Sequence, residues 1–267
     1  MMKLSPRLKK IAEQINAGET MADIGTDHGF LPIYLWENKI CPKVIMADIS
    51  SGSLSKAREN CEMYDPDARF DLRLGSGIEV LKEAEVDAVV MAGMGGILMT
   101  EILEKDVKKS LSFRKLILQP RKDVGKLRYW LFNNGFSITN EALVREGKYI
   151  CEIITAVPKE VAITRQMNGD DIEYEFPHSL IDYNDELLEE YLNTKRKLET
   201  EILANMKKLG FTNRGIKTTG GLYYLNHTIN KAILVEVCFV DDKDDYDLYK
   251  KVGYKQIAKA IADGITG

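Results

Sequence analysis

The sequence predicts an α/β fold built on a doubly wound, mostly parallel β-sheet, and three observations lead to this prediction. Strand-like apolar runs alternate with helical patterns five times in the first half of the chain. One run, Val86–Ala92, is apolar except for Asp87, which is typical of a strand in the middle of a parallel sheet. Glycine-bearing turns follow several of the runs, at the positions where the ends of parallel strands meet.

The strands and helices can be placed in chain order. The strands are expected at Met21–Ile24, Lys43–Ala47, Arg69–Leu74, Val86–Ala92 and Lys115–Leu118. The helices are expected at residues 3–16, Leu31–Glu37, 53–63, Ile97–Leu103 and Val124–Phe132. The first helix has Ser5 as a capping residue and Pro6 at its first position. Ser137–Val144 and Tyr149–Val157 then predict a hairpin that ends the sheet with an antiparallel strand.

A change of composition after this hairpin predicts three regions. Residues 1–157 form the main domain, residues 158–209 form a linker with a long helix at Asp185–Leu209, and residues 210–267 form a tail. The apolar stripe of the long helix is narrow, so this helix needs a partner helix or a groove. In the tail we expect a strand at Ala232–Val240 and a short amphipathic helix at Gln256–Ala262.

Composition excludes several classes of protein. The chain is 45% hydrophobic and 29% charged, as expected for a globular protein, and no apolar run approaches the roughly 20 residues of a membrane span. Its formal net charge of −4 means that any nucleic acid must be held by a local basic patch. The four cysteines are scattered and the amino terminus lacks an apolar signal region, so we expect a cytoplasmic protein without a bound metal.

The turn after the first strand, Asp23-Ile24-Gly25-Thr26-Asp27-His28-Gly29, carries the most chemistry. Its spacing differs from the Gly-x-Gly-x-x-Gly pattern that accommodates a diphosphate at a helix terminus. Asp23 and Asp27 would repel a diphosphate and attract a cation, and S-adenosylmethionine carries both a sulfonium and an ammonium group. We therefore interpret the turn as a binding site for this methyl donor; a glycine-rich turn with a capping Asp is the alternative.

The turns after the next strands are further cofactor-binding candidates. Asp48, with Ile49 beside it, lies where an acidic residue accepts the ribose hydroxyls, although Asp48 could instead cap the following helix. Two glycine-bearing turns, which could also be tight turns without a ligand, are expected near the adenine ring and the donor methyl group. They comprise Gly75, Ser76 and Gly77 after the third strand, and Ala92, Gly93, Met94 and Gly95 at the end of the fourth.

Basic residues gather after the fifth strand. Arg121, Lys122, Lys126 and Arg128 could hold RNA phosphates beside the site, or could simply form a solvated helix face. A second basic face, at the first helix, has a solvated helix face as its favoured interpretation; it comprises Lys3, Arg7, Lys9 and Lys10.

Several ordered motifs resemble one family. They are the turn at Asp23–Pro32, Ala92–Gly96, Leu118-Gln119-Pro120 and Leu127-Arg128-x-Trp130-Leu131. Together they resemble the bacterial tRNA adenine-N1 methyltransferases that act on adenine 22. The resemblance implies a Rossmann-like class I methyltransferase fold, S-adenosylmethionine as cofactor, tRNA as partner, and a helical second domain that helps to hold the tRNA.

The mechanism that we expect is in-line transfer of the methyl group to adenine N1. Because N1 has a free lone pair, positive charge develops on the base, and we expect Asp27 to stabilise it. His28 would accept a later proton or pack nearby. The sequence departs from the family at Ser76, where Asp is usual, at Arg121, where Asn is frequent, and in lacking a clear second long helix.

From about residue 200 the chain resembles the last third of the zinc-dependent N-acetylmuramoyl-alanine amidases, through segments 221–225, 232–240 and 257–265. Glu236 matches that family's catalytic glutamate, but the part that supplies the zinc ligands is missing and the chain's three histidines do not replace it. We therefore expect a tail without hydrolase activity. The alternatives for the whole chain are a methyltransferase of a small molecule or a protein, a cell-wall amidase-related protein, and a cofactor-binding protein without catalysis.

Overall fold

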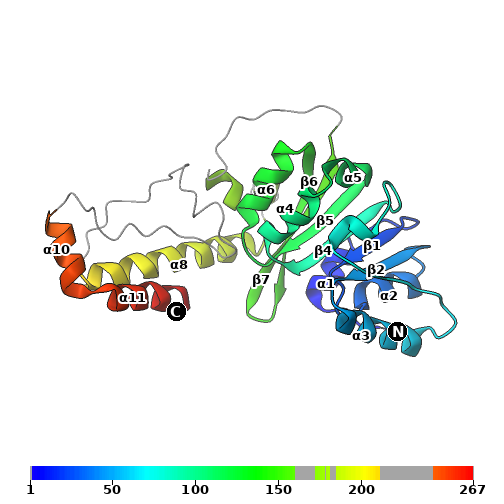
Figure 1. Cartoon of the computed structure of the whole chain (residues 1–267), viewed down its shortest axis with the longest axis horizontal. Helices are drawn as coiled ribbons and strands as arrows, with labels where there is room; N and C mark the ends of the chain where they lie inside the picture. Colours follow the sequence, from blue (N-terminus) through cyan, green and yellow to red (C-terminus); the bar gives the residue numbers. More distant parts are fainter. Residues whose placement is uncertain (1, 160–171, 178, 181–184, 211–242, 267) are drawn as a thin grey trace. The chain divides into compact units, whose positions relative to one another are not determined.

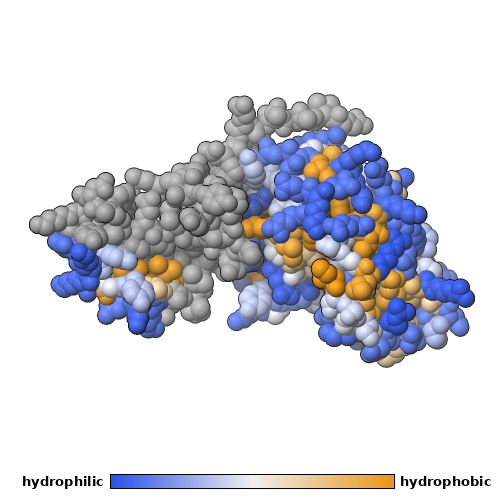
Figure 2. Space-filling model, in the orientation of Figure 1, coloured by the Kyte–Doolittle hydropathy of each residue, from blue (hydrophilic) through white to orange (hydrophobic). Residues whose placement is uncertain are grey.

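A computed structural model of the chain describes residues 2–159, 172–177, 179–180, 185–210 and 243–266. The chain divides into two compact units, Met1–Asp185 and Glu186–Gly267 (Figure 1). Within the described part of the chain, none of the helices could span a membrane. On the face of the first unit seen in Figure 2, hydrophobic residues are interspersed with hydrophilic ones.

The first unit is built on a seven-stranded sheet with the strand order β3-β2-β1-β4-β5-β7-β6. The strands are β1 (Met21–Ile24), β2 (Val44–Asp48), β3 (Asp71–Leu74), β4 (Ala88–Met94), β5 (Lys115–Pro120), β6 (Phe136–Glu146) and β7 (Tyr149–Pro158). The first five strands pair in parallel, whereas β7 runs antiparallel to both β5 and β6. The predicted doubly wound sheet with its terminal hairpin is therefore confirmed.

Helices cover both faces of this sheet (Figure 1). They are α1 (Pro6–Ala12), α2 (Phe30–Glu37), α3 (Ser51–Tyr64), α4 (Gly96–Glu104), α5 (Val107–Ser112) and α6 (Val124–Asn133), with short 3-10 turns η1 (Gly77–Val80) and η2 (Ile172–Glu175). One buried cluster joins the sheet to Met99 of α4 and Leu127 of α6, and the other joins it to Ile11 of α1 and Leu31 of α2. Strands buried between two helical layers explain the apolar runs in the sequence.

Two local features differ from the sequence prediction. β4 continues through Gly93 to Met94, with a register irregularity between Ala92 and Met94 where it pairs with β5. The glycine-rich turn therefore begins inside the strand. Helix α5 was not predicted; it is only six residues long, and the Asp106 side chain caps it by accepting from the backbone N–H of Lys109 at 2.9 Å. One such capping contact is a weak signal in a sequence.

The second unit is mostly helical where it is described. It contains α8 (Leu188–Lys208), α10 (Lys243–Val252) and α11 (Tyr254–Thr266). α11 packs along α8, and the side-chain amide of Asn205 donates to the carbonyl of Ala260 at 3.2 Å. The short amphipathic helix expected at Gln256–Ala262 is confirmed, because these residues lie within the 13-residue α11. The strand expected at Ala232–Val240 lies outside the described residues, as do Glu236 and residues 160–171, 178 and 181–184 of the expected linker.

Candidate functional site

The candidate site lies at the carboxyl ends of the parallel strands. The chain moves outward from β1 to β3 and then returns to β4 on the other side of β1, so the strand order reverses between β1 and β4. Ligands of open α/β sheets bind at this switch point. The two glycine-rich turns flank it. Gly25 has a φ of +82°, a conformation that favours glycine, and a Cβ there would lie 2.4 Å from Cε at the end of the Met94 side chain, so the two turns lie close together.

Asp23 supplies a half-buried carboxylate at the end of β1. Burial raises the pKa of Asp23 to about 6, the Thr26 hydroxyl and the Arg7 guanidinium oppose this rise, and the Asp48 carboxylate adds to it. A carboxylate that is costly to ionise in the ligand-free protein gains most from a cationic partner. Asp23 therefore has the properties required of an ammonium or sulfonium ligand.

Asp27 and His28 lie in the turn but are more exposed. The Asp27 carboxylate pairs with Lys56 Nζ of α3 at 3.1 Å and with His28 Nε2 at 3.3 Å, and its side chain is 60% exposed. The His28 ring stacks on Phe30, with the ring centroids 5.1 Å apart. The turn thus presents a partly neutralised carboxylate and an aromatic pair to solvent.

Asp48 ends β2 as expected, and its backbone carbonyl accepts from the N–H of Gly75 at 3.0 Å. The Asp48 Oδ1 atom accepts from the backbone N–H of Ser50 at 2.6 Å, and it is Ser50 that caps α3. Asp48 therefore does not cap the helix itself. The neighbouring Ile49 is 76% exposed, which leaves an apolar side chain beside this carboxylate.

The turn at Gly75, Ser76 and Gly77 follows β3 at the same edge of the sheet. The Ser76 hydroxyl accepts from Lys105 Nζ at 3.2 Å, and Lys105 also pairs with Glu79 at 2.8 Å. A lysine contact therefore lies where the resembling family usually carries a carboxylate.

The loop after β5 packs directly on the glycine-rich end of β4. The backbone N–H of Arg121 donates to the carbonyl of Met94 at 2.8 Å, and the N–H of Gly96 donates to the carbonyl of Lys122 at 2.9 Å. The side-chain oxygen of Gln119 accepts from the N–H of Gly93 at 3.1 Å. The predicted basic residues Arg121 and Lys122 thus adjoin the turn expected to face the donor methyl group.

The sequence placed Arg7 on a basic face but did not indicate which residues it contacts. Its Nη1 donates to Gln119 Oε1 at 3.0 Å, and its Nε pairs with Glu146 of the hairpin at 3.1 Å. Arg7 therefore connects α1, β5 and β6 at the edge of the site. These partners are 112 and 139 residues away in sequence, and no local pattern indicates such contacts.

The remaining basic candidates differ in accessibility. Arg121 and Lys9 are exposed, Lys122 and Lys126 are half-buried, and Lys10 pairs with Glu13 at 3.2 Å. Arg128 is 2% exposed and pairs with Glu141 at 2.7 Å and with Glu152. The expectation that Arg128 contacts RNA is therefore wrong, because its guanidinium group is buried and paired with two carboxylates of the protein.

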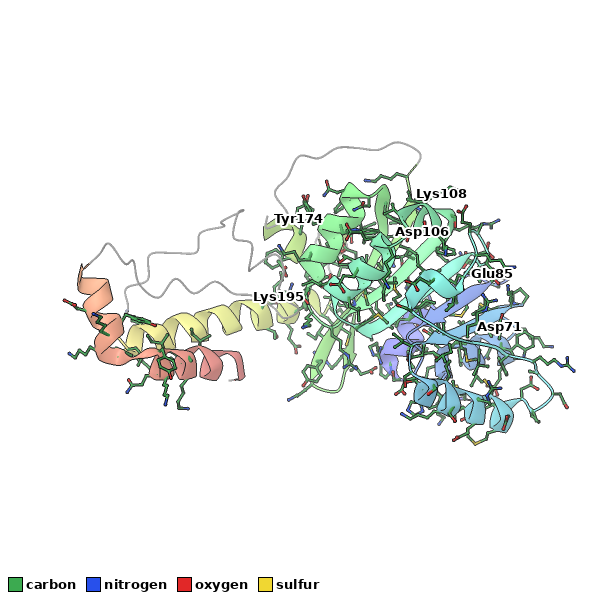
Figure 3. All side chains as sticks on the ribbon, in the orientation of Figure 1. Asp71, Glu85, Asp106, Lys108, Tyr174 and Lys195 are labelled. Atoms are coloured by element: carbon green, nitrogen blue, oxygen red, sulfur yellow. The ribbon has the colours of Figure 1, made fainter. Side chains whose placement is uncertain are left out.

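Arg128 instead fixes the segment that follows the sheet. Its Nη1 donates to the carbonyl of Tyr174 in η2 at 2.9 Å, and the Tyr174 ring lies 5.4 Å from that of Tyr129 (Figure 3). Glu141 also accepts from the Ser179 hydroxyl at 2.6 Å. No group of three or more His, Cys, Asp and Glu residues suited to a metal ion is found among the described residues.

Comparison with known proteins gives two family matches. Residues 4–154 match the family described as a methyltransferase domain, and residues 151–267 match the N-acetylmuramoyl-L-alanine amidase family. The tRNA (adenine(22)-N(1))-methyltransferase of Bacillus subtilis is 36% identical over 155 residues, which cover 58% of this chain and 65% of that protein. The match thus spans just under two thirds of this relative.

Solved structures share the fold over nearly the whole chain. The B. subtilis M1A22 tRNA methyltransferase TrmK has a TM-score of 0.63 and 23% identity, covering 99% of this chain and 100% of that one. M. capricolum TrmK, in complex with S-adenosyl-homocysteine, has a TM-score of 0.60 and 24% identity, covering 98% of this chain and 99% of that one. At these identities the structural likeness establishes the fold.

Proposed function

The chain belongs to the methyltransferase domain family, and from that membership we propose that it transfers the methyl group of S-adenosylmethionine to N1 of adenine 22 in tRNA. The main structural support is that one edge of the sheet holds the Asp23 and Asp48 carboxylates, the backbone of Gly93 and the basic loop at Arg121. The similarity to the B. subtilis enzyme supports the choice of adenine 22. A tRNA substrate would place the reaction in the cytoplasm.

The residues at the switch point fit this cofactor. Asp23 offers a carboxylate whose ionisation a cation would favour, and Asp48 keeps its second carboxylate oxygen for the ribose hydroxyls. The exposed Ile49 offers an apolar surface to an adenine ring. When bound, S-adenosylmethionine supplies an electrophilic methyl group on a sulfonium that leaves as a neutral thioether.

The chain's own residues would then position the base and balance charge. The two glycine-rich turns would let the base approach the donor closely and in line. As the bond to N1 forms, positive charge appears on adenine, and the exposed Asp27 carboxylate can stabilise it. No proton must leave N1 before attack. The stacking of His28 on Phe30 favours a role in positioning the base. Because N1 is occupied in a base pair, a paired adenine must first be exposed.

The decisive experiment uses the purified full chain, labelled S-adenosylmethionine and unmodified tRNA, followed by digestion to nucleosides. The proposal expects label in 1-methyladenosine, and expects none when adenine 22 is replaced by guanine. Label in another nucleoside, or only in a protein or a small molecule, would contradict it. Asp27→Ala should abolish transfer without unfolding the protein, whereas the exposed and distant Asp67→Ala should not affect it.

The basic loop can be tested by its effect on tRNA binding. Arg121→Glu combined with Lys122→Glu should weaken binding and should lower the slope of log affinity against log salt by about 1.4 to 1.8, since each lost phosphate contact removes roughly 0.7–0.9. An unchanged slope would place the tRNA elsewhere. Arg69→Glu combined with Lys82→Glu reverses two charges outside this loop and serves as the control.

A further inference from the structure

Two arginine side chains converge on one point at the end of β4. A carbon at the Cβ position of Gly93 would lie 3.7 Å from Nε of Arg121 and 3.8 Å from its Nη2. The same point would lie 3.9 Å from Nη1 of Arg7. Guanidinium groups are always charged, and two like charges this close repel each other unless an anion joins them. The position next to the Cα atom of Gly93 is therefore flanked by two cations.

The nearby carboxylates, Glu146 and Asp23, face Arg7, and neither of them pairs with Arg121. Glu146 accepts from Nε of Arg7 at 3.1 Å and from its backbone N–H at 2.8 Å, so one edge of Arg7 is compensated. The Nη1 atom of Arg7 donates to Gln119, which is neutral. Within the part of the chain that the structure describes, Arg121 forms no ion pair, and it is exposed.

The Arg7 side chain is held in place before any ligand arrives. Gln119 Oε1 accepts both from Nη1 of Arg7 and from the backbone N–H of Gly93. The backbone N–H of Arg121 donates to the carbonyl of Met94, one residue further along β4, while its side chain is exposed. A ligand would therefore have to order only the Arg121 side chain on binding.

We propose that Arg7 and Arg121 form an oxyanion-binding site above Gly93, which takes a carboxylate or a phosphate. The planar guanidinium fork matches either group. The proposal deepens the proposed function and rests on it, since that reaction brings two such anions to this edge of the sheet. One is the α-carboxylate of S-adenosylmethionine, and the other is a tRNA phosphate close to the target nucleotide.

The two sources can be separated by calorimetric titration of the full-length protein with S-adenosylmethionine and with its decarboxylated analogue. If the site takes the α-carboxylate, the wild type should bind the intact cofactor about tenfold or more tightly than the analogue. Arg121→Ala and Arg7→Ala should then lose that preference while keeping their affinity for the analogue. Arg7→Lys retains a charge and should keep part of the preference.

If the site takes a phosphate, the cofactor affinities should not change. Arg121→Ala should then weaken tRNA binding and lower its salt slope by roughly 0.7–0.9. The control is Arg69→Ala, which removes an exposed arginine before β3. Because Arg7 also holds Glu146, the exposed Arg121 decides the test if Arg7→Ala does not fold.

The proposal is overturned if Arg121→Ala matches Arg69→Ala both in its preference for the intact cofactor and in its tRNA salt slope. Either effect without formation of 1-methyladenosine would leave the oxyanion site standing and would refute the proposed reaction.

Discussion

Replacing Asp23 by Asn should stabilise the ligand-free protein while weakening cofactor binding. Burial raises the pKa of Asp23 from an ordinary value of 3.8 to about 6. Between these two values the folded state binds more protons than the unfolded state, so stability falls as pH rises from about 4 to 6 and is then constant. Because a pKa difference of one corresponds to about 1.36 kcal/mol, a difference of roughly two lowers the free energy of unfolding at neutral pH by about 3 kcal/mol. Asn carries no charge and escapes this cost.

Urea unfolding of the wild type and Asp23→Asn at several pH values between 4 and 8 would measure the effect. The variant should be more stable at pH 7 by up to about 3 kcal/mol, and the difference should shrink toward pH 4. Calorimetry should show cofactor affinity reduced by tenfold or more, as expected where stability and function conflict. If the variant were no more stable than the wild type at pH 7, the buried-charge argument would be refuted. Normal cofactor affinity would remove Asp23 from the site.

Three further predictions concern packing and buried charge. A Cβ on Gly96 would lie 2.3 Å from the backbone oxygen of Asp123, so Gly96→Ala should lower the free energy of unfolding in urea by about 2 to 3 kcal/mol. A Cβ on Gly95 lies nearest to the flexible side chain of Lys122, so Gly95→Ala should cost far less. Equal losses for the two variants would contradict the contact. Arg128→Met removes the cation that pairs with two buried carboxylates and should cost about 3 to 5 kcal/mol, and a melting temperature within about 2 °C of the wild type would contradict the network. Hydrogen bonding to Arg73 holds the pKa of Glu85 far below its usual range, so this stabilisation is present above about pH 4.5 and is lost on acidification (Figure 3). In Glu85→Gln the melting temperature should be lower at neutral pH and should depend less on pH. If the melting temperature of the variant fell at acidic pH as much as that of the wild type, the pairing would be contradicted.

Much of the sheet could be predicted because the burial of its strands is visible in their residue types. A strand covered on both faces must be apolar along its length, and Val89, Val90 and Met91 of β4 are fully buried. The terminal hairpin could also be predicted, since the short polar turn before Tyr149 separates two runs of alternating polar and apolar residues. The order of the strands places their following turns at one edge, which is why residue types alone could assemble Asp23, Asp48 and Gly93 into one candidate site.

The parts that escaped prediction depend on which charges become buried. Arg121 and Arg128 look alike in the sequence, yet Arg121 faces solvent while Arg128 lies between β6, β7 and η2. That difference is decided by Glu141 and Glu152, which are 13 and 24 residues further along the chain. Arg7 escaped for the same reason. Hydropathy predicts which face of a helix is buried. Which charged side chain becomes buried depends on partners that lie far away in the sequence.

The position of the amidase-like match bears on how the tail joins the methyltransferase domain. That match begins at residue 151, inside β7, which pairs with both β5 and β6. Ile153 and Ile154 of this strand are buried, one in each of the two core clusters. A polypeptide boundary at residue 150 would therefore remove the strand that links the terminal hairpin to the parallel sheet. The contacts of Arg128 with Tyr174 and of Glu141 with Ser179 extend the packed unit further still. By its packing, the methyltransferase unit continues well past residue 151, and likeness to a second family in that overlap does not make those residues part of a second domain.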